Sequence, residues 1–262
     1  MAMADDRNRL SARRRSGRRC WKAAAPADDG EGCTTRAAVS APVLARLLTW
    51  LSPAFPVGGF SYSHGLEWLV EAGHIADAPR LGDWIEDVLR HGAGRTDAIF
   101  LAEAWRAVAA ADAARLTEIA DFAAAFATTA ERRLETLAQG AAFLTAVAAA
   151  WPHPVLGELN DASGIAYPVA VGASAAAHGL PLPAAAHAFT QAFAASLVSA
   201  GVRLIPLGQS DGLRLLARLE GVIAEVAAAA VRLRLEDAGG AAILVEIASM
   251  RHETQYTRLF RS

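Results

Sequence analysis

Residues 164–202 read GIAYPVAVGASAAAHGLPLPAAAHAFTQAFAASLVSAGV, a run of 39 residues without Asp, Glu, Lys or Arg. Its length alone would allow a membrane span. Most of it is Ala, Gly and Ser, however, and Ala contributes little insertion free energy compared with Leu or Phe. The sequence Gly179-Leu-Pro-Leu-Pro183 also divides the run into two pieces. We therefore predict two helices, opening at Pro168 and Pro183, that are buried inside a helical domain.

Amphipathic helices are predicted on both sides of this run. The clearest is Pro79–His91, whose large apolar residues recur with the helical period while its charged residues fall on the opposite face. The best candidate for a strand, Val231–Leu235, is short. We predict an all-α fold with one compact multi-helix domain over residues 42–250. Further helices are predicted at 43–51, at about 96–110 with Thr96 or Asp97 as its cap, at 112–126, from the capping-box sequence Thr128–Glu131 to just before Trp151, and from Ser210 or Asp211 onward, and a final segment, 241–250, leads into the tail.

Residues 1–41 differ from the rest of the chain in charge. They hold nine of the 25 basic and five of the 27 acidic residues, which leaves 16 basic and 22 acidic residues in the body. An acidic body argues against a nucleic-acid partner. Both cysteines, Cys20 and Cys33, lie in this leader, which fits a reducing compartment. Arg18-Arg19 is followed by acids and a proline instead of an apolar run, so we expect a disordered basic leader and a cytoplasmic protein.

The segment Ser52–Glu67 holds the most reactive side chains of the body. Pro53, Pro56 and the pair Gly58-Gly59 favour a tight link between helices. A hydrolase using Ser63 and His64 is the alternative, but neighbours on a helix point apart, and neither Ser61 nor Ser63 stands in a Gly-x-Ser-x-Gly turn. His64 and Glu67 could share a metal ion, yet the other histidines form no His-x-x-x-His pair that would complete a site, so we predict no stable metal site.

A nucleotide-binding loop is not indicated either. The phosphate-loop pattern is absent, and the only lysine of the chain, Lys22, lies in the leader. The glycine-bearing stretch Gly201–Gly212 has the wrong spacing and is predicted to link two helices. Arg203, at the end of an uncharged helix, must either reach solvent or pair with a carboxylate.

The last residues, Met250–Ser262, have the composition of an interface. They contain no Gly or Pro, and they combine Met, aromatic and Arg side chains, the types enriched where proteins meet. One helical turn would place Tyr256, Leu259 and Phe260 on one side. We predict a tail at 251–262 that docks onto a partner; packing on its own domain is the alternative. The predicted partner-binding residues are Met250, Arg251, His252, Glu253, Gln255, Tyr256, Arg258, Leu259, Phe260 and Arg261.

Three of these stretches together resemble the signatures of the urease accessory protein F (UreF) family. They are Leu51–Glu67 (LSPAFPVGGFSYSHGLE), Ser199–Gly212 (SAGVRLIPLGQSDG) and Ala248–Ser262 (ASMRHETQYTRLFRS), and they occur in the family's order. A weaker fourth match is Glu131–Gly140 (ERRLETLAQG). The resemblance spans about residues 42–262 and leaves the leader without a counterpart.

This resemblance implies an all-α, non-catalytic chaperone that helps to assemble the nickel centre of urease. The implied partners are accessory protein D (also called H), the GTPase accessory protein G and apo-urease, and a homodimer is expected. No cofactor would be bound stably, although the complex would depend on nickel and GTP. Carried onto this sequence, Met250–Arg261 would order against accessory protein D, and Tyr62 and His64 would face the GTPase or line a water-filled route for nickel. The remaining alternatives are the all-α hydrolase and a membrane-associated helical protein.

Overall fold

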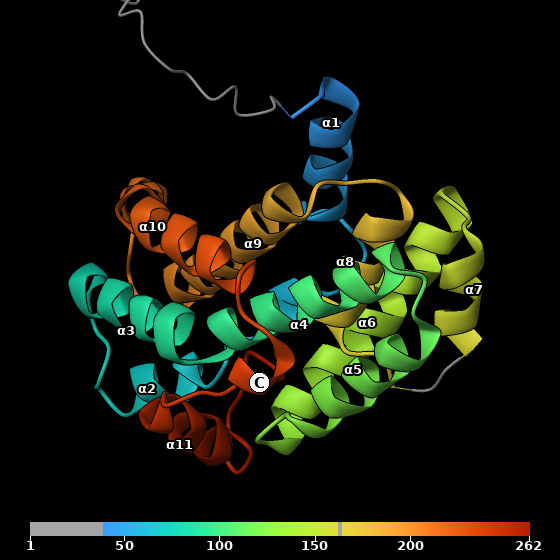
Figure 1. The fold of residues 1–262 in the computed structure, drawn as a ribbon. Helices are drawn as coiled ribbons and strands as arrows, with labels where there is room; N and C mark the ends of the chain where they lie inside the picture. The colour runs from blue at the N-terminus through green and yellow to red at the C-terminus, as the bar shows by residue number, and fades with distance from the viewer. Residues whose placement is uncertain (1–38, 162–163) are drawn as a thin grey trace, which may run out of the picture. The chain divides into compact units, whose positions relative to one another are not determined.

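The computed structural model describes residues 39–161 and 164–262, and within these ranges the chain forms α-helices and short 3-10 turns without any strand. The all-α prediction is confirmed. The helices are α1 (Ala41–Trp50), α2 (Leu66–Glu71), α3 (Ala78–His91), α4 (Ala93–Ala109), α5 (Ala113–Ala125), α6 (Ala130–Ala150), α7 (Pro154–Asp161), α8 (Tyr167–Ala177), α9 (Leu182–Leu204), α10 (Gln209–Ala230) and α11 (Ile243–His252) (Figure 1). The predicted leader lies, up to residue 38, outside the described residues.

The uncharged run forms α8 and α9, as predicted. Residues 168–175 of α8 are all buried, and α8 packs against α4 and α6. Two glycines allow this packing. A Cβ at Gly172 would lie 2.2 Å from the carbonyl oxygen of Leu101, and one at Gly140 would lie 2.0 Å from that of Ile165. Within the described ranges, no helix combines the length and hydropathy of a membrane span.

Helix α9 joins the two main hydrophobic clusters of the domain. Its first half, with Phe189, belongs to the cluster formed by α1 and α4–α8. Its second half, with Leu197, belongs to the cluster formed by α2, α3, α10 and α11. Figure 1 shows α9 and α10 side by side above α3. The C-terminal helix α11 packs against α2. This contact brings the last of the three motifs (Ala248–Ser262) beside the first motif (Leu51–Glu67), while Ser199–Gly212 is the second.

Several predicted helix boundaries need correction. Helix α6 is capped by Thr129, whose side chain accepts from the Arg132 N–H, and not by Thr128. Helix α10 begins after Gly208, and Asp211 acts from inside the first turn by accepting the Gly208 N–H. Helix α4 begins at Ala93, three residues earlier than predicted, so Asp97 is an interior residue and not a cap.

The one candidate for a strand is not a strand, and one helix was missed. Residues 231–235 form a turn leading into a 3-10 helix, because Arg106 of α4 donates to the carbonyl oxygens of Val231 and Leu233 and thereby uses acceptors that a strand would need. Helix α7 was not predicted. Its signal is Pro154 at the first helical position, preceded by His153, whose Nδ1 accepts from the Val155 N–H.

Candidate functional site

The first motif turns sharply before α2 and brings His64 inside the protein. Gly65 has a φ of 79°, and an added Cβ would lie 2.6 Å from the backbone nitrogen of Ser249 on α11. Only glycine permits such an approach. His64 itself has a φ of 57°, which is uncommon for a residue with a Cβ and is found more often at functional sites.

The His64 ring belongs to a buried ionic cluster on α6. Its Nε2 lies 3.0 Å from Glu135 Oε1 and 2.7 Å from Arg132 Nη1, and Arg132 also pairs with Glu135. Burial, followed by the charge of Arg132, lowers the pKa of His64. Burial by itself would raise the pKa of Glu135, but Arg132 and His64 outweigh it and bring that pKa down to about 2. Glu135 is therefore an anion throughout the physiological pH range, with Arg132 as its counter-charge.

The carboxylate of Glu67, in the first motif, binds the main chain of the C-terminal segment (residues 253–262). Oε1 accepts the N–H of Leu259 at 2.6 Å, and Oε2 accepts the N–H of Phe260 at 2.9 Å. These are charge-assisted hydrogen bonds, the stronger kind. Because the carboxylate contacts backbone groups, the path of the chain at 259–260 is fixed whatever side chains stand there.

His252 is fully buried between carboxylates of two different helices. Its Nε2 lies 3.1 Å from Glu67 of α2, and its Nδ1 lies 2.7 Å from Glu131 of α6. The second oxygen of Glu131 accepts from Arg258 at 2.8 Å. These contacts connect α2, α6, α11 and the C-terminal segment in one polar network.

Ser63 holds the last residue of the segment. Its N–H and its Oγ both donate to the Ser262 carbonyl oxygen at 2.5 Å, and Ser262 Oγ donates to Glu135 at 3.0 Å. In the described structure, Ser63 Oγ is thus directed at Ser262 while His64 is directed at α6. The pair does not have the nucleophile-to-base contact that the hydrolase alternative needs.

The second motif contributes Arg203 to the same region. Arg203 is exposed, one of its two predicted outcomes, and its guanidinium carbon lies 4.3 Å from the centre of the Phe260 ring. Its Nη2 also donates to the Phe60 carbonyl oxygen at 2.7 Å. Arg203 therefore bridges the first motif and the C-terminal segment.

The predicted docking residues fall into an inward and an outward set. His252 and Phe260 are buried and Gln255 is partly buried, whereas Tyr256 is 102% exposed and Leu259 is 65% exposed. Residues 253–262 contain no helix, so the expected single helical side is wrong: Glu67 fixes an irregular backbone that sends Phe260 inward and Leu259 outward. The other outward residues are Met250, Arg251, Glu253, Arg258 and Arg261.

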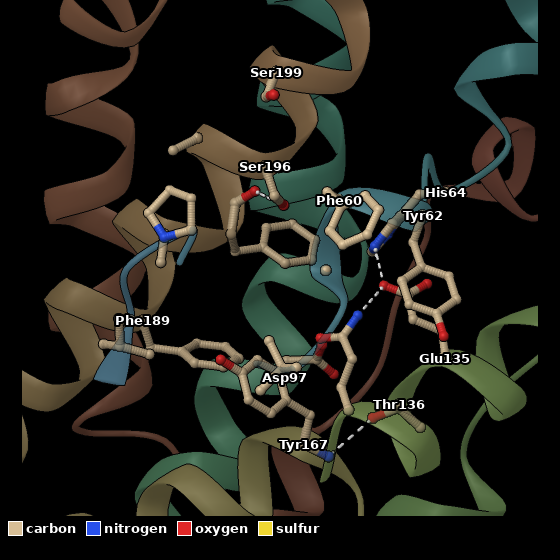
Figure 2. A pocket seen from close by; sticks show the side chains of 18 of the residues that line it. Phe60, Tyr62, His64, Asp97, Glu135, Thr136, Tyr167, Phe189, Ser196 and Ser199 are labelled. Atoms are coloured by element: carbon tan, nitrogen blue, oxygen red, sulfur yellow. Dashed lines mark hydrogen bonds and ion pairs between the residues drawn. The ribbon is translucent and has the colours of Figure 1, made fainter. Parts of the chain in front are cut away.

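A first cavity of about 180 Å³ lies beside the His64 cluster (Figure 2). Tyr62 and His64 are both buried and line this cavity, so neither forms part of the outer surface. Figure 2 shows His64 directed at Glu135, with Tyr167 on the opposite wall; burial raises the pKa of Tyr167. Phe60, at the rim, is 70% exposed.

Asp97 of α4 lines the first cavity and also a second cavity of about 160 Å³, between α4, α5, α6 and α11. Its Oδ2 lies 3.9 Å from Arg132 Nη2, beyond hydrogen-bond distance. Burial, only partly offset by Arg132, raises the pKa of Asp97 to about 7.

Sequence reasoning missed most of the buried charges. Glu131, Arg132 and Glu135 lie in the weaker fourth match, where no site was predicted. Asp97 was considered only as a helix cap. The usable signal was Glu131–Glu135, four charged residues at the start of a helix that is otherwise mostly apolar.

Across residues 39–161 and 164–262, no three His, Cys, Asp or Glu side chains are grouped so that they could hold a metal ion. His64 and Glu67 do not share a site: the former faces Glu135 and the latter faces His252.

Comparison with known proteins identifies the family. The UreF family model matches residues 75–220. The urease accessory protein UreF of Rhodopseudomonas palustris strain BisB5 is 55% identical over 221 residues, which cover 84% of this chain and 91% of that protein. The UreF protein of Bradyrhizobium diazoefficiens is 51% identical over 228 residues, covering 86% and 94%. The chain belongs to the UreF family. In this UreF-family chain, the three motifs that are far apart in sequence meet at one polar network, which makes that network and the adjoining surface the candidate site.

Proposed function

We propose that this protein is a cytoplasmic, non-catalytic chaperone of urease maturation. Together with accessory protein D (also called H) and the GTPase accessory protein G, it promotes GTP-dependent insertion of nickel into apo-urease. Nickel is the cargo of that complex and not a resident cofactor. The proposal is carried by one observation: in a UreF-family chain, exposed apolar and aromatic side chains gather at the C-terminal end, where Glu67 holds the backbone at residues 259 and 260.

Accessory protein D is the partner that we assign to this end. The exposed residues Ile243, Leu244, Ile247 and Met250 form the α11 face, and Tyr256 and Leu259 extend the apolar surface along the segment that follows. Contiguous exposed apolar side chains with an arginine rim are typical of protein interfaces. Since Glu67 already fixes the backbone at 259–260, the partner would bind an ordered segment at a smaller entropic cost.

The double variant Tyr256→Ala/Leu259→Ala tests this assignment. Both side chains are exposed, so the fold should survive while co-purification with accessory protein D and urease activation are lost. The matched control is Leu213→Ala, an exposed leucine of α10. Unchanged binding of the double variant, together with unchanged binding after deletion of residues 256–262, would contradict the assignment.

The first cavity supports a route for nickel more than a surface for the GTPase. Tyr62 and His64 are buried in its wall, next to carboxylate oxygens of Asp97 and Glu135. We propose that nickel passes through this space on its way to urease. Ala195→Phe, which would fill the cavity from α9, should slow urease activation while binding of accessory protein D persists.

The proposed homodimer forms through α1. Leu44 and Leu48 of this helix are exposed, and α1 extends away from α9 at the edge of the domain (Figure 1). Leu44→Asp/Leu48→Asp should convert a dimer into a monomer in sedimentation analysis. A dimer that persists in this variant would require another interface.

A further inference from the structure

The second cavity has apolar walls and an acidic interior. Phe100 and Phe126 form part of its wall, and Ile243 of α11 stands at its rim, 69% exposed. Asp97 and Glu246 supply two carboxylates to its lining. The cavity is therefore amphipathic, with a place for an apolar stem and a place for a charged group.

The lining of this cavity contains more carboxylates than cationic groups. Among the described residues that line the cavity, Arg132 is the only basic one, and Glu135 already pairs with it. Asp97 stays 3.9 Å away, and Glu246 accepts from the Thr128 hydroxyl. A raised pKa, about 7, is what an under-compensated and largely buried carboxylate should show. The titratable and charged groups around Asp97 are Arg132 and Glu135 of α6, Tyr167 of α8, Glu246 of α11, and His64 and Tyr62 of the first motif.

The mouth of the cavity adjoins the α11 face. Ile243 belongs to both, and Ile247 and Met250 follow it one and two turns further along the helix. A deep pocket beside an apolar ridge is the arrangement in which interface hot spots form. The first cavity lacks this arrangement, because none of the described residues that line it belongs to α11.

We propose that the second cavity receives a basic side chain, Lys or Arg, which the partner bound at the α11 face inserts between Phe126 and Ile243 toward Asp97 and Glu246. This inference rests on the proposed function, in which accessory protein D is that partner. The alkyl stem of the inserted residue would lie against the apolar wall, and its charged head would meet the two carboxylates. The residue would act as the anchor of the interface.

Proton release gives this proposal a specific readout. Near pH 7 about half of the Asp97 carboxyls are protonated in the free protein, since the pKa is about 7. A cation placed against Asp97 lowers that pKa, so binding should release about half a proton per complex near pH 7. Calorimetric titration with accessory protein D, repeated in two buffers of different ionisation enthalpy, measures this number.

Two variants and two controls complete the experiment. Asp97→Asn removes the charge, and Ala127→Phe fills the second cavity without changing any charge; each should weaken binding by about 10-fold or more, and Asp97→Asn should abolish the proton release. Asp87→Asn, an exposed acid of α3, and Ala195→Phe, which fills the first cavity, should bind normally. Circular dichroism confirms the fold of each variant, and Ala127→Phe carries the test if Asp97→Asn fails to fold.

The outcomes separate this inference from the proposed function. If the unmodified protein does not bind accessory protein D, the proposed function and this inference fail together. If it binds without proton release, and Asp97→Asn and Ala127→Phe bind equally well, only this inference is overturned. Release of about half a proton and selective weakening by the two variants would support it.

Discussion

Helix α8 and the C-terminal segment 253–262 both contact α6, but different kinds of interaction hold them in place. In α8, residues 168–175 are all buried, and the helix is positioned by close backbone approach. In the segment only Phe260 and Ser262 are buried, and carboxylates of Glu67 and Glu131 hold the chain by hydrogen bonds. Helix α8 is therefore held by close packing, and the segment is held by hydrogen bonds to charged carboxylates.

This difference separates stability from docking. A volume change in α8 disturbs a close-packed interior that cannot relax easily. Loss of a carboxylate contact in the segment leaves a region that can detach into water, since its outward residues already lie in solvent. Damage to α8 should therefore unfold the domain, whereas damage to the network should free the segment.

The largest effect is expected for Gly172→Ala. The new Cβ would lie 2.2 Å from the Leu101 carbonyl oxygen, so α4 and α8 would have to separate. We expect a loss of about 3 kcal/mol in the free energy of unfolding, the upper part of the range for overpacked cores. Urea denaturation followed by circular dichroism measures it.

Gly221→Ala in α10 is the matched control. No atom lies within 4 Å of the position where its Cβ would stand. Replacement of an exposed helical glycine by alanine should stabilise the protein by about 0.5–1 kcal/mol. If both variants changed stability alike, close packing of α8 would not be what holds the domain together.

A smaller and more local effect is expected for Glu67→Ala. The N–H groups of Leu259 and Phe260 would lose their acceptor, and His252 would lose one of its two partners. We expect about 2 kcal/mol of destabilisation, limited because the segment can detach. Hydrogen exchange at the two amides should accelerate far more than exchange in α8.

The control for this variant is Glu158→Ala, an exposed glutamate of α7. It should leave exchange at residues 259 and 260 unchanged. Equal acceleration of hydrogen exchange in α8 and in the segment after Glu67→Ala would mean that the two regions unfold as one unit. It would contradict the claim that the segment detaches independently of α8.

The same contrast explains what could be predicted from the sequence. The helices over 164–202 follow from local properties: the absence of charge, Ala and Gly content, and the break at Gly179. Pattern and composition act over a few residues, so α3, α8 and α9 were predicted with nearly correct boundaries. Helix α7 was missed because it is short and follows a proline that suggested a loop.

The site was harder because its contacts join residues that are far apart in the chain. Glu67 and Phe260 are 193 positions apart, and Glu131 and His252 are 121 apart. Composition indicated that the end of the chain was unusual, but it could not show that Tyr256 is exposed and Phe260 buried. Which side chain is buried depends on the position of Glu67 once α2 and α11 have packed together.

A pH-dependent effect is expected for Asp97→Asn. The folded pKa of about 7 lies above the ordinary value of 3.8, so the folded protein binds the proton more tightly than the unfolded chain does. The contribution of Asp97 to the stability of the wild-type protein should therefore fall as the pH rises from about 4 through 7, and the asparagine variant lacks this contribution. We expect the variant to gain at least about 1 kcal/mol relative to wild type between pH 5 and pH 8.

Urea denaturation at several pH values checks this prediction. Glu135 does not interfere in this range, because its pKa is lowered from 4.5 to about 2 and its contribution is lost only as the pH falls below about 4.5. Parallel stability curves for the two proteins between pH 5 and pH 8 would show that Asp97 is compensated in the free protein.

The smallest effect is expected for Arg203→Met. Methionine keeps much of the apolar length but removes the guanidinium that lies 4.3 Å from the Phe260 ring and donates to the Phe60 carbonyl oxygen. An exposed cation–π contact contributes about 0.5–1 kcal/mol, and the segment keeps its carboxylate contacts at Glu67. Exchange at the Phe260 amide should therefore rise by less than about 10-fold, well below the effect of Glu67→Ala. Arg203→Lys should restore little, because a compact ammonium group does not stack on the ring as a planar guanidinium does. If Arg203→Met freed the segment as fully as Glu67→Ala, the second motif and not the first would control its position.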